Sequence, residues 1–410
     1  MPLAPSLAAL EGGSSAPLPL QVGDVARLAV ENSPDLRATR AQRGVAQAQL
    51  LQAGLAPNPS VTGSILPLAA GFGSTNAWNA GLSYDIKSLI TLRSRRRAAG
   101  EQARSVDASL LWAEWQTANQ AQLLTVDMMM GERALAVLQQ TRGLVAGRAT
   151  RSSRALAEGN VTLTTAAPDI AALQTARTAL FDQERLQLTR RHQLNALLGL
   201  RPDTLLPLAP TPELPAFDPA HAAAAIPSLA DRRPDLVALR LGYAAQDQKI
   251  RTAILSQFPN LSIGITGGSD NSNVRNVGPQ IQLELPIFDH AQGLIAQENA
   301  SREQLHAEYT ARLAAATGQV GALLAEMKLQ RRQLAVVRHD LAGIERTAAA
   351  AQSALQAGNL DERSALDLIS ARATKQLEII GLEQALLDQQ IAIGTLVGAG
   401  MPTVDPAPPP

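Results

Sequence analysis

The 410-residue sequence contains no cysteine, which excludes disulfide bonds, thiolate metal sites and a lipid-modified N-terminal cysteine. Aromatic residues make up only 3% of the chain, too few for several ordinary globular cores. No run approaches the roughly 18 apolar residues of a transmembrane helix. The 36 basic and 36 acidic side chains balance to a net charge of zero, which gives no electrostatic footprint for nucleic acid. The abundance of Ala, Leu, Gln and Arg that remains is typical of long packed helices.

Residue patterns typical of catalysis are also missing. No metal-ligand spacing relates the five histidines, which are His192, His221, His290, His306 and His339. Met128, Met129 and Met130 point in different directions on a helix, so we expect them to pack rather than to bind a soft metal. We therefore expect no catalytic residues, no cofactor and no resident metal, and predict that the chain is not an enzyme.

Short alternating stretches predict two β-hairpins. In the second hairpin, at about 261–285, apolar Ile263, Ile281 and Leu283 alternate with polar neighbours, and residues 267–273 read as its turn.

In the first hairpin, at about 60–86, Trp78, Leu82 and Tyr84 share an apolar face. Its other strand is expected at about Ser60 to Leu66, because Pro67 disfavours a longer one.

A long helix is predicted after each hairpin. The tract from about Ile90 to Ala157 reads as one helix of roughly 68 residues, near 100 Å in length. Gly159 and Asn160 end it, with glycine suited to a left-handed C-cap, and a return helix is expected at about 169–198. Gly358 and Asn359 make the corresponding break in the second tract.

The pattern is duplicated. Pro34-Asp35-Leu36 recurs as Pro234-Asp235-Leu236 at an offset of 200, and the two helix breaks are 199 apart. The predicted organisation is an arm (1–22), a first repeat (23–199), a proline-rich non-helical connector (200–228), a second repeat (229–399) and a disordered tail (400–410). Each repeat contains a helix, a β-hairpin, a long helix and a return helix.

Four strands are too few for a membrane barrel, which needs about eight, because open edges leave backbone groups unpaired. Three chains would supply twelve strands. Helices near 100 Å long cannot bury themselves as one globule, but several copies side by side can enclose a tube. The predicted fold is mainly α with a small β part, in which duplicated long-helix hairpins form an α-barrel and a trimer forms a twelve-stranded transmembrane β-barrel.

The duplicated Pro-Asp-Leu helix, the breaks at Gly159 and Gly358 and the hairpin ending in Leu285-Pro286-Ile287-Phe288-Asp289 resemble the TolC family of outer-membrane efflux proteins. The resemblance covers roughly residues 22–400. Within the family, the stretches 233–236 and 285–293 resemble the CzcC-like branch, which serves heavy-metal pumps.

The resemblance implies a homotrimer in the bacterial outer membrane that extends into the periplasm. It implies a passive exit channel for metal ions or small toxic compounds, with a periplasmic adaptor protein, an inner-membrane pump and outer-membrane lipid as partners, and no nucleic acid. The adaptor would meet the tips at Gly159, Asn160, Gly358 and Asn359. The resemblance also implies that Asp367 helps to form a cation-attracting ring at the periplasmic end, although Ser370 and Ala172 replace further acids.

Lipid contact is expected for the apolar strand residues Trp78, Leu82, Tyr84, Ile263, Ile281 and Leu283. The alternative function is a soluble periplasmic coiled-coil scaffold or adaptor, which would need no apolar strand face. The first 20 residues lack the basic region and apolar core of a signal peptide. The sequence leaves open whether a leader has been removed or the protein is not exported.

Overall fold

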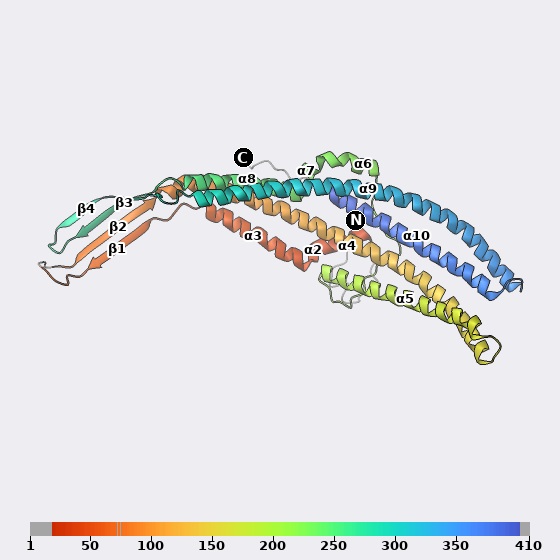
Figure 1. Cartoon of the computed structure of the whole chain (residues 1–410). Helices are drawn as coiled ribbons and strands as arrows, with labels where there is room; N and C mark the ends of the chain where they lie inside the picture. The colour runs from red at the N-terminus through yellow and green to blue at the C-terminus, as the bar shows by residue number, and fades with distance from the viewer. Residues whose placement is uncertain (1–18, 72, 74, 402–410) are drawn as a thin grey trace. The chain divides into compact units, whose positions relative to one another are not determined.

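The computed structural model describes residues 19–71, 73 and 75–401. Two short β-hairpins and a series of long helices make up the chain (Figure 1). In chain order the elements are α2 (Val22–Asn32), α3 (Pro34–Gly54), β1 (Ser60–Leu66), β2 (Ala77–Asp85), α4 (Ile86–Ala157), α5 (Leu163–Leu198), α6 (Pro219–Ala225), η1 (Ile226–Ser228), α7 (Leu229–Arg232), α8 (Pro234–Leu255), β3 (Asn260–Ser269), β4 (Arg275–Glu284), α9 (Gln292–Gln356) and α10 (Glu362–Val397). The predicted fold class, mainly helical with a small four-stranded sheet, is confirmed.

Local capping explains where the helices begin. The Ser33 hydroxyl accepts a hydrogen bond from the Leu36 backbone N–H, and α3 starts with Pro34 at its first position. α4 begins at Ile86, earlier than the expected Ile90. The reason is Asp85, whose carboxylate accepts hydrogen bonds from the backbone and hydroxyl of Ser88 and so caps the helix directly after β2.

The return helix α5 also begins earlier than expected, at Leu163 rather than at residue 169. Pro168 lies inside the helix near its start. A proline there removes one backbone hydrogen bond, but its φ angle is already helical. The expected start at about residue 169 was therefore wrong by about one and a half turns.

The four strands form one antiparallel sheet in the order β1-β2-β3-β4. The hairpin turn between β3 and β4 is shorter than expected. Gly267, Gly268 and Ser269 belong to β3, and the turn is closed by the Asp270 carboxylate, which accepts hydrogen bonds from two backbone N–H groups in the turn. The expected strand from Ser60 to Leu66 is observed with those bounds.

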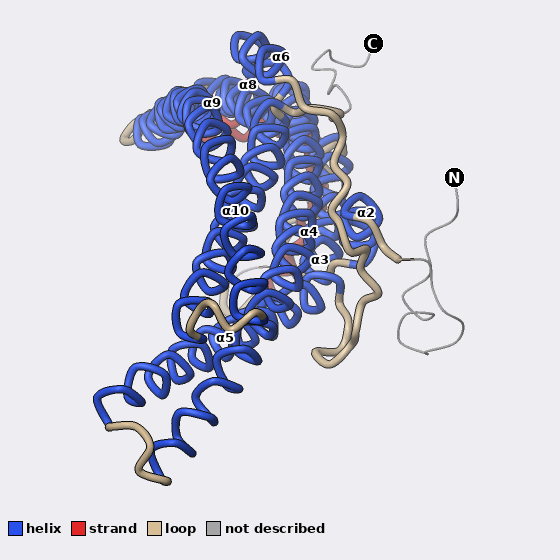
Figure 2. Tube along the Cα trace, turned by 90° about the vertical axis from the view of Figure 1, so that its right-hand side faces the viewer, coloured by secondary structure: helices blue, strands red, loops and turns tan. Residues whose placement is uncertain are grey.

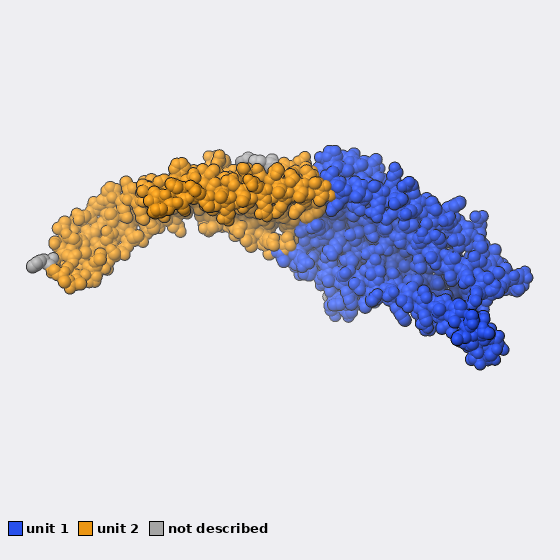
Figure 3. Space-filling model, viewed as in Figure 1, with its two compact units in different colours: residues 1–38, 113–229, 316–401 blue, residues 39–112, 230–315, 402–410 orange. Residues whose placement is uncertain are grey.

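The chain divides into two compact units, coloured separately in Figure 3. Unit 1 comprises residues 1–38, 113–229 and 316–401. Its core is formed where α2 packs on α4 and α5, and it contains Val25, Leu28, Met128, Leu194 and Leu198. A neighbouring cluster joins α4 to α10 through Met129, Met130, Ile380 and Ile391. The three methionines are therefore packing residues, as expected.

Among the described residues, unit 2 comprises the parts 39–112 and 230–315 and contains the sheet. Ala108 of α4 packs on Val237 and Leu241 of α8, and the Ser105 hydroxyl donates to the Ala238 carbonyl at 2.7 Å. At the start of α8 the buried Arg233 forms a two-pronged ion pair with Asp235, at 3.0 and 2.8 Å, and stacks on Trp112. This explains the local role of the Arg-Pro-Asp-Leu stretch.

The proline-rich connector is not wholly non-helical, which corrects the prediction for residues 200–228. Asp218 caps α6, accepting a hydrogen bond from the Ala220 N–H at 2.9 Å, and Pro219 occupies the first helical position. Upstream, Leu20 and Leu208 form a parallel bridge. Figure 2 shows the connector as a long loop beside the helices.

No helix in the described part of the chain is long and apolar enough to cross a membrane. Most of the expected arm (1–22) and nearly all of the expected disordered tail (400–410) lie outside the described residues.

Candidate functional site

The sheet has one mainly apolar face and one mainly polar face; the exceptions, at the hairpin ends of the strands, are Ser269 and Arg275 on the apolar face and Leu66 on the polar one. Residues directly opposite each other in an antiparallel sheet share a face. The register places all six predicted apolar residues on one face, together with further apolar residues. That face, called here the apolar sheet face, contains Val61, Ile65, Trp78, Leu82, Tyr84, Leu261, Ile263, Ile265, Val277, Pro279, Ile281 and Leu283.

The apolar sheet face is open in the single chain. Leu82 is 52% exposed, Ile281 71% and Val277 81%. An exposed apolar patch of this kind marks a surface that contacts lipid or another protein. The alternation in the sequence already places Ile265 on the apolar side of its strand, although the six residues expected to contact lipid did not include it, and Val277 was not identified from the sequence. Val277 was missed because β4 already begins at Arg275, within a stretch that the sequence pattern had not assigned to a strand.

The opposite face carries Ser, Thr, Asn, Gln and Glu side chains that bond to one another. Ser60 and Ser83 hydroxyls lie 2.7 Å apart, and the Thr266 hydroxyl donates to the Asn79 side chain at 3.2 Å. A polar ladder of this kind is compatible with contact to water. The two faces together suit a sheet that separates an apolar medium from an aqueous one.

Both predicted helix breaks have the same geometry. Gly159 and Gly358 adopt left-handed φ angles of 76° and 72°. At the first break Asn160 N–H donates to Ala155 O at 2.8 Å, and at the second Asn359 N–H donates to Ala354 O at 2.8 Å. In both breaks the glycine N–H also donates to the carbonyl three residues before it, Leu156 or Leu355. The two hydrogen bonds together form a Schellman C-cap. The breaks therefore end α4 and α9 by the same device.

Replacing either glycine tests this assignment. Gly159→Ala or Gly358→Ala should each destabilise the protein by about 1 kcal/mol, because a Cβ disfavours left-handed φ. No heavy atom lies within 4 Å of an added Cβ at either site, so steric crowding does not contribute. Gly143→Ala, inside α4 and equally uncrowded, is the control and should stabilise slightly. Chemical denaturation measures the difference, and equal signs at the three positions would contradict the C-cap assignment.

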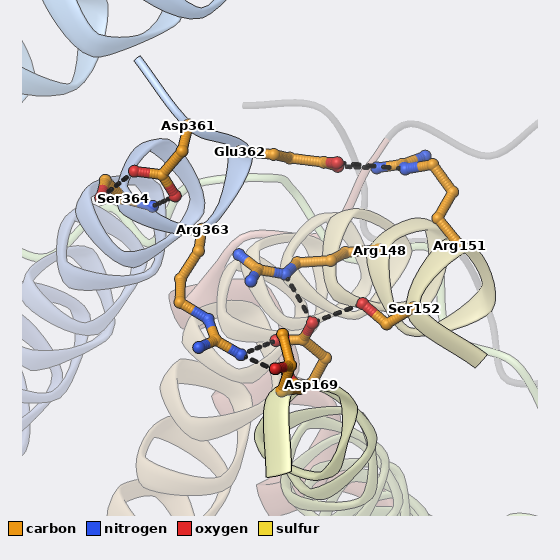
Figure 4. A network of polar contacts seen from close by, with 9 residues as sticks. Arg148, Arg151, Ser152, Asp169, Asp361, Glu362, Arg363 and Ser364 are labelled. Atoms are coloured by element: carbon orange, nitrogen blue, oxygen red, sulfur yellow. Dashed lines mark hydrogen bonds and ion pairs between the residues drawn. The ribbon is translucent and has the colours of Figure 1, made fainter. Parts of the chain in front are cut away.

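Close to the two breaks a polar network joins α4, α5 and α10 (Figure 4). Asp169 of α5 lies at its centre, with only 8% exposure. Its carboxylate pairs with Arg148 of α4 at 3.0 Å and with Arg363 of α10 at 3.3 Å, and accepts a hydrogen bond from Ser152 at 2.5 Å. We call Arg148, Ser152, Asp169 and Arg363 the tip network.

The positive charges and hydrogen bonds of its partners explain why the buried carboxylate of Asp169 stays ionised. Burial alone would raise the pKa of Asp169, but the hydrogen bonds from Ser152, Arg148 and Arg363 outweigh it and lower the pKa. Arg363 also donates to the Thr165 carbonyl at 2.8 Å, and Arg151 of α4 pairs with Glu362 of α10. Ion pairs thus hold the C-terminal part of α4 beside the N-terminal parts of α5 and α10.

Sequence reasoning missed the tip network because its members are far apart in the chain. It selected instead Asp367, which lies one turn after Arg363 on α10 and is exposed. Asp169, directly after Pro168, was the available signal, since an acid near the start of a helix is favoured by the helix dipole.

A second, partly buried charge cluster lies farther along the same helices. Asp127 of α4 pairs with Arg190 of α5 at 3.3 Å and accepts a hydrogen bond from Gln384 of α10. One turn on, burial and the charge of Asp127 raise the pKa of Asp388 to about 7, against the opposing effect of Arg190. Burial also raises the pKa of Asp127, again opposed by Arg190.

Asp388 should make stability depend on pH. An acid whose pKa is higher in the folded than in the unfolded state loses stability as pH rises through the interval between the two values. Asp388→Asn should therefore melt higher than the unmodified protein, by a difference that grows from pH 4 to pH 8. Thermal melts across this range measure it. A difference that does not change with pH would contradict the buried-acid interpretation.

Trp115 of α4 is hydrogen-bonded to α10, its Nε1 donating to the Thr395 carbonyl at 3.3 Å. Within residues 19–71, 73 and 75–401, no three His, Asp or Glu side chains come together as a metal ion would require.

Comparisons with known proteins agree with this architecture. Residues 225–399 match the sequence profile of the family described as outer membrane efflux protein. No curated protein sequence matches the chain. The matched region includes the second repeat, where the hairpin alternation is most regular.

Solved structures show the same fold over nearly the whole chain. CusC, described in connection with transmembrane channel formation, is 19% identical with a TM-score of 0.72, covering 93% of both chains. The CmeC outer membrane channel of Campylobacter jejuni is 16% identical with a TM-score of 0.77, covering 92% of this chain and 86% of that one. The outer membrane protein VceC of Vibrio cholerae is 16% identical with a TM-score of 0.74, covering 93% and 97%.

These likenesses are to efflux and channel proteins, which agrees with the prediction that the chain is not an enzyme. The second half of this chain carries the sequence pattern of the outer membrane efflux protein family, and the chain as a whole has the fold of outer-membrane channels.

Proposed function

We propose that three copies of this chain form a passive duct across the bacterial outer membrane, as the exit channel of a tripartite efflux system. The observation that carries the proposal is the apolar sheet face, exposed in a sheet with two open edges, β1 and β4. A sheet can enter a bilayer only when every edge is paired. Three sheets joined edge to edge give twelve strands and leave no open edge, with apolar side chains toward lipid and polar ones toward a water-filled lumen.

In this arrangement the residues that contact lipid are Trp78, Leu82, Tyr84, Ile263, Ile281 and Leu283, together with Ile265 and Val277. A soluble scaffold or adaptor gives no reason for such a face. The long helices line the periplasmic part of the duct. A continuous helix of the length of α4, 72 residues, measures roughly 110 Å.

The tips at Gly159, Asn160, Gly358 and Asn359 are the proposed contact with a periplasmic adaptor, and energy would come from an inner-membrane pump. The tip network holds α4, α5 and α10 together where the adaptor would dock. The proposed cargo is metal ions or small toxic compounds. The likeness of residues 233–236 and 285–293 to the heavy-metal branch supports metal ions as the first cargo to test.

Mass measurement in mild detergent and conductance in planar bilayers test the duct directly. The expected results are three copies per particle and a stable aqueous pore. A folded monomer without conductance would instead support the scaffold function. Crosslinkers at Asn160 and Asn359 should capture the adaptor in cells.

Asp367 is the proposed gate residue. Three copies around the axis would bring three carboxylates together, and rings of acids favour cations. Asp367→Asn should therefore reduce cation preference and weaken block by multivalent cations, while trimer mass stays the same. Reversal potential under a salt gradient is the measurement. An unchanged reversal potential would show that Asp367 is an ordinary exposed carboxylate with no role in ion selectivity.

A further inference from the structure

Helix α4 carries four exposed arginines close to its start, Arg93, Arg95, Arg96 and Arg97. Successive helical residues are about 100° apart around the axis, so Arg93, Arg96 and Arg97 lie within an arc of about 100°. Arg95 lies outside this arc, about 160° from both Arg93 and Arg97. We call Arg93, Arg96 and Arg97 the basic patch.

The basic patch continues the apolar side of the sheet rather than the polar side. Asp85, the last residue of β2, belongs to the polar face of the sheet. Its carboxylate accepts hydrogen bonds from Ser88, which therefore lies on the polar side at the start of α4. Arg93 and Arg97 lie about 140° and 180° around the helix from Ser88, and so on the side of the apolar sheet face. Arg95 lies only about 20° from Ser88, on the polar side.

Between the sheet and the basic patch, the same side of α4 is apolar. Ile90, about 160° around the helix from Ser88, is 61% exposed, and Leu89 is 39% exposed. With increasing distance from the sheet, this side therefore changes from apolar to basic. A bilayer has the same order, since its hydrocarbon core is followed on each side by a polar headgroup region about 5–8 Å thick.

Arginine side chains on α4 lean back toward the sheet. Side chains of a helix tilt toward its N-terminus, and α4 begins directly after β2 (Figure 1). Arg95 shows the reach of such a side chain, because its guanidinium donates at 3.0 Å to the carbonyl of Ser88, seven residues earlier. The Cα atoms of Arg93 and Arg97 lie about 12 Å and 18 Å along the helix from Asp85, so a lean of one turn brings their guanidinium groups to about 7 Å and 13 Å. If the sheet spans the hydrocarbon core, these are the depths of the headgroups and of their aqueous edge.

The basic patch has no counter-charge of its own. Among residues 19–71, 73 and 75–401, no carboxylate pairs with any of its three arginines. The nearest acids along α4 already have partners, because Glu101 pairs with Arg104 at 3.0 Å and Asp107 pairs with Arg43 at 2.9 Å. Like charges three and four residues apart on a helix repel each other. An anion from outside the chain would relieve this repulsion.

A groove beside the basic patch combines charge with an apolar end. The groove, of about 1060 Å³, runs along α3 and α4 and is lined by all three arginines. Leu50 and Gly54 of α3 and Leu89 of α4 line it as well. An added Cβ at Gly54 would lie 3.7 Å from the Cδ atom of Arg96, so this glycine lets the arginine stem lie close to α3. Such a groove suits a molecule with an anionic head and an apolar body.

We infer that the basic patch binds the phosphate groups of anionic phospholipids in the periplasmic leaflet of the outer membrane. Guanidinium groups form paired, charge-assisted hydrogen bonds with phosphate, and basic side chains beside a bilayer attract anionic lipids. The apolar end of the groove would receive the glycerol backbone and the upper part of an acyl chain. The inference rests on the proposed duct and adds the class of lipid at its membrane boundary.

Lipid retention tests the inference. The full chain, purified in mild non-ionic detergent, is mixed with micelles that contain either phosphatidylglycerol or phosphatidylcholine, and native mass spectrometry counts the lipids retained per particle. The two lipids share the phosphate and the acyl chains but differ in net charge. The unmodified protein should retain at least about fivefold more phosphatidylglycerol than phosphatidylcholine. The triple variant Arg93→Gln, Arg96→Gln and Arg97→Gln should retain the two lipids about equally.

Two further variants control for charge and for position. Arg95→Gln removes an arginine from the same stretch of α4 but from the polar side, so it should leave the lipid preference unchanged. The triple variant Arg93→Lys, Arg96→Lys and Arg97→Lys keeps the charge and should keep a preference of at least about twofold. A full preference in the glutamine triple variant, or an equal loss in Arg95→Gln, would overturn the inference.

Inorganic phosphate distinguishes a lipid surface from a site for a soluble anion. An excess of inorganic phosphate over lipid should displace little phosphatidylglycerol, because phosphate lacks the apolar body that the groove would hold. Complete displacement would mean that the basic patch binds soluble phosphate, and the inference would be wrong.

Particle mass and bilayer conductance of the same preparations separate the two proposals. The arginines of the basic patch are exposed, so the glutamine triple variant should still form conducting trimers. An unmodified trimer that conducts but shows no lipid preference would overturn this inference and leave the duct standing. A monomer without conductance would overturn both.

Discussion

Leu82→Arg and Ile281→Arg should each abolish assembly of the protein in the outer membrane. Both side chains lie on the apolar sheet face near the middle of their strands, and each is more than half exposed. If that face meets lipid, an arginine near the bilayer midplane costs roughly 2–4 kcal/mol per copy. A trimer carries the substitution three times. The measurement is the amount of trimer extracted from outer membranes by mild detergent.

The control lies one residue away. Gln282 is exposed on the opposite face of β4, so Gln282→Arg should assemble normally. Leu283→Arg, near the end of the strand, should have a smaller effect than Ile281→Arg, because the cost falls toward the membrane surface. Normal assembly of Leu82→Arg and Ile281→Arg would show that the apolar sheet face does not meet lipid.

Asp169→Asn should cause the second large effect. The substitution leaves Arg148, whose side chain is 12% exposed, without its buried counter-charge. Breaking a buried ion pair typically costs 3–5 kcal/mol, and we expect about 3 kcal/mol because Arg363 is 41% exposed. Chemical denaturation measures the loss, and hydrogen exchange near the starts of α5 and α10 should rise.

The contribution of Asp169 has a definite pH window. Its pKa is lower in the folded state, so its stabilising effect is present above the unfolded value of 3.8 and is lost as pH falls below it. Asp182→Asn is the matched control. Asp182 also pairs with an arginine on α5, but its side chain is 60% exposed, and such pairs contribute about 0–1 kcal/mol. Equal effects of the two substitutions would show that the tip network adds no special stability.

Helix starts show where local sequence reading fails in this chain. Asp85 caps α4 four residues before the expected start, and Pro168 lies within α5 where a boundary was expected. Both starts were predicted from the pattern of apolar residues and prolines. The actual start of α4 depends on one capping side chain, and α5 starts early because a proline is tolerated near its N-terminus. The same reading assigned residues 267–269 to a turn, although glycine is compatible with a strand that pairs on both sides.

The sequence by itself determined the order of the elements, the strand alternation and the two helix breaks, because each depends on neighbours within a few residues. It could also select all six apolar strand residues, since a period of two assigns a face without knowing the partner strand. Only the tertiary structure decided that both hairpins join through β2 and β3 into one sheet, which merges two apolar stripes into one face. It alone brought Arg148, Asp169 and Arg363 together. These features depend on which helices pack side by side, and such contacts between residues far apart in the chain have no local pattern that a sequence reading can detect.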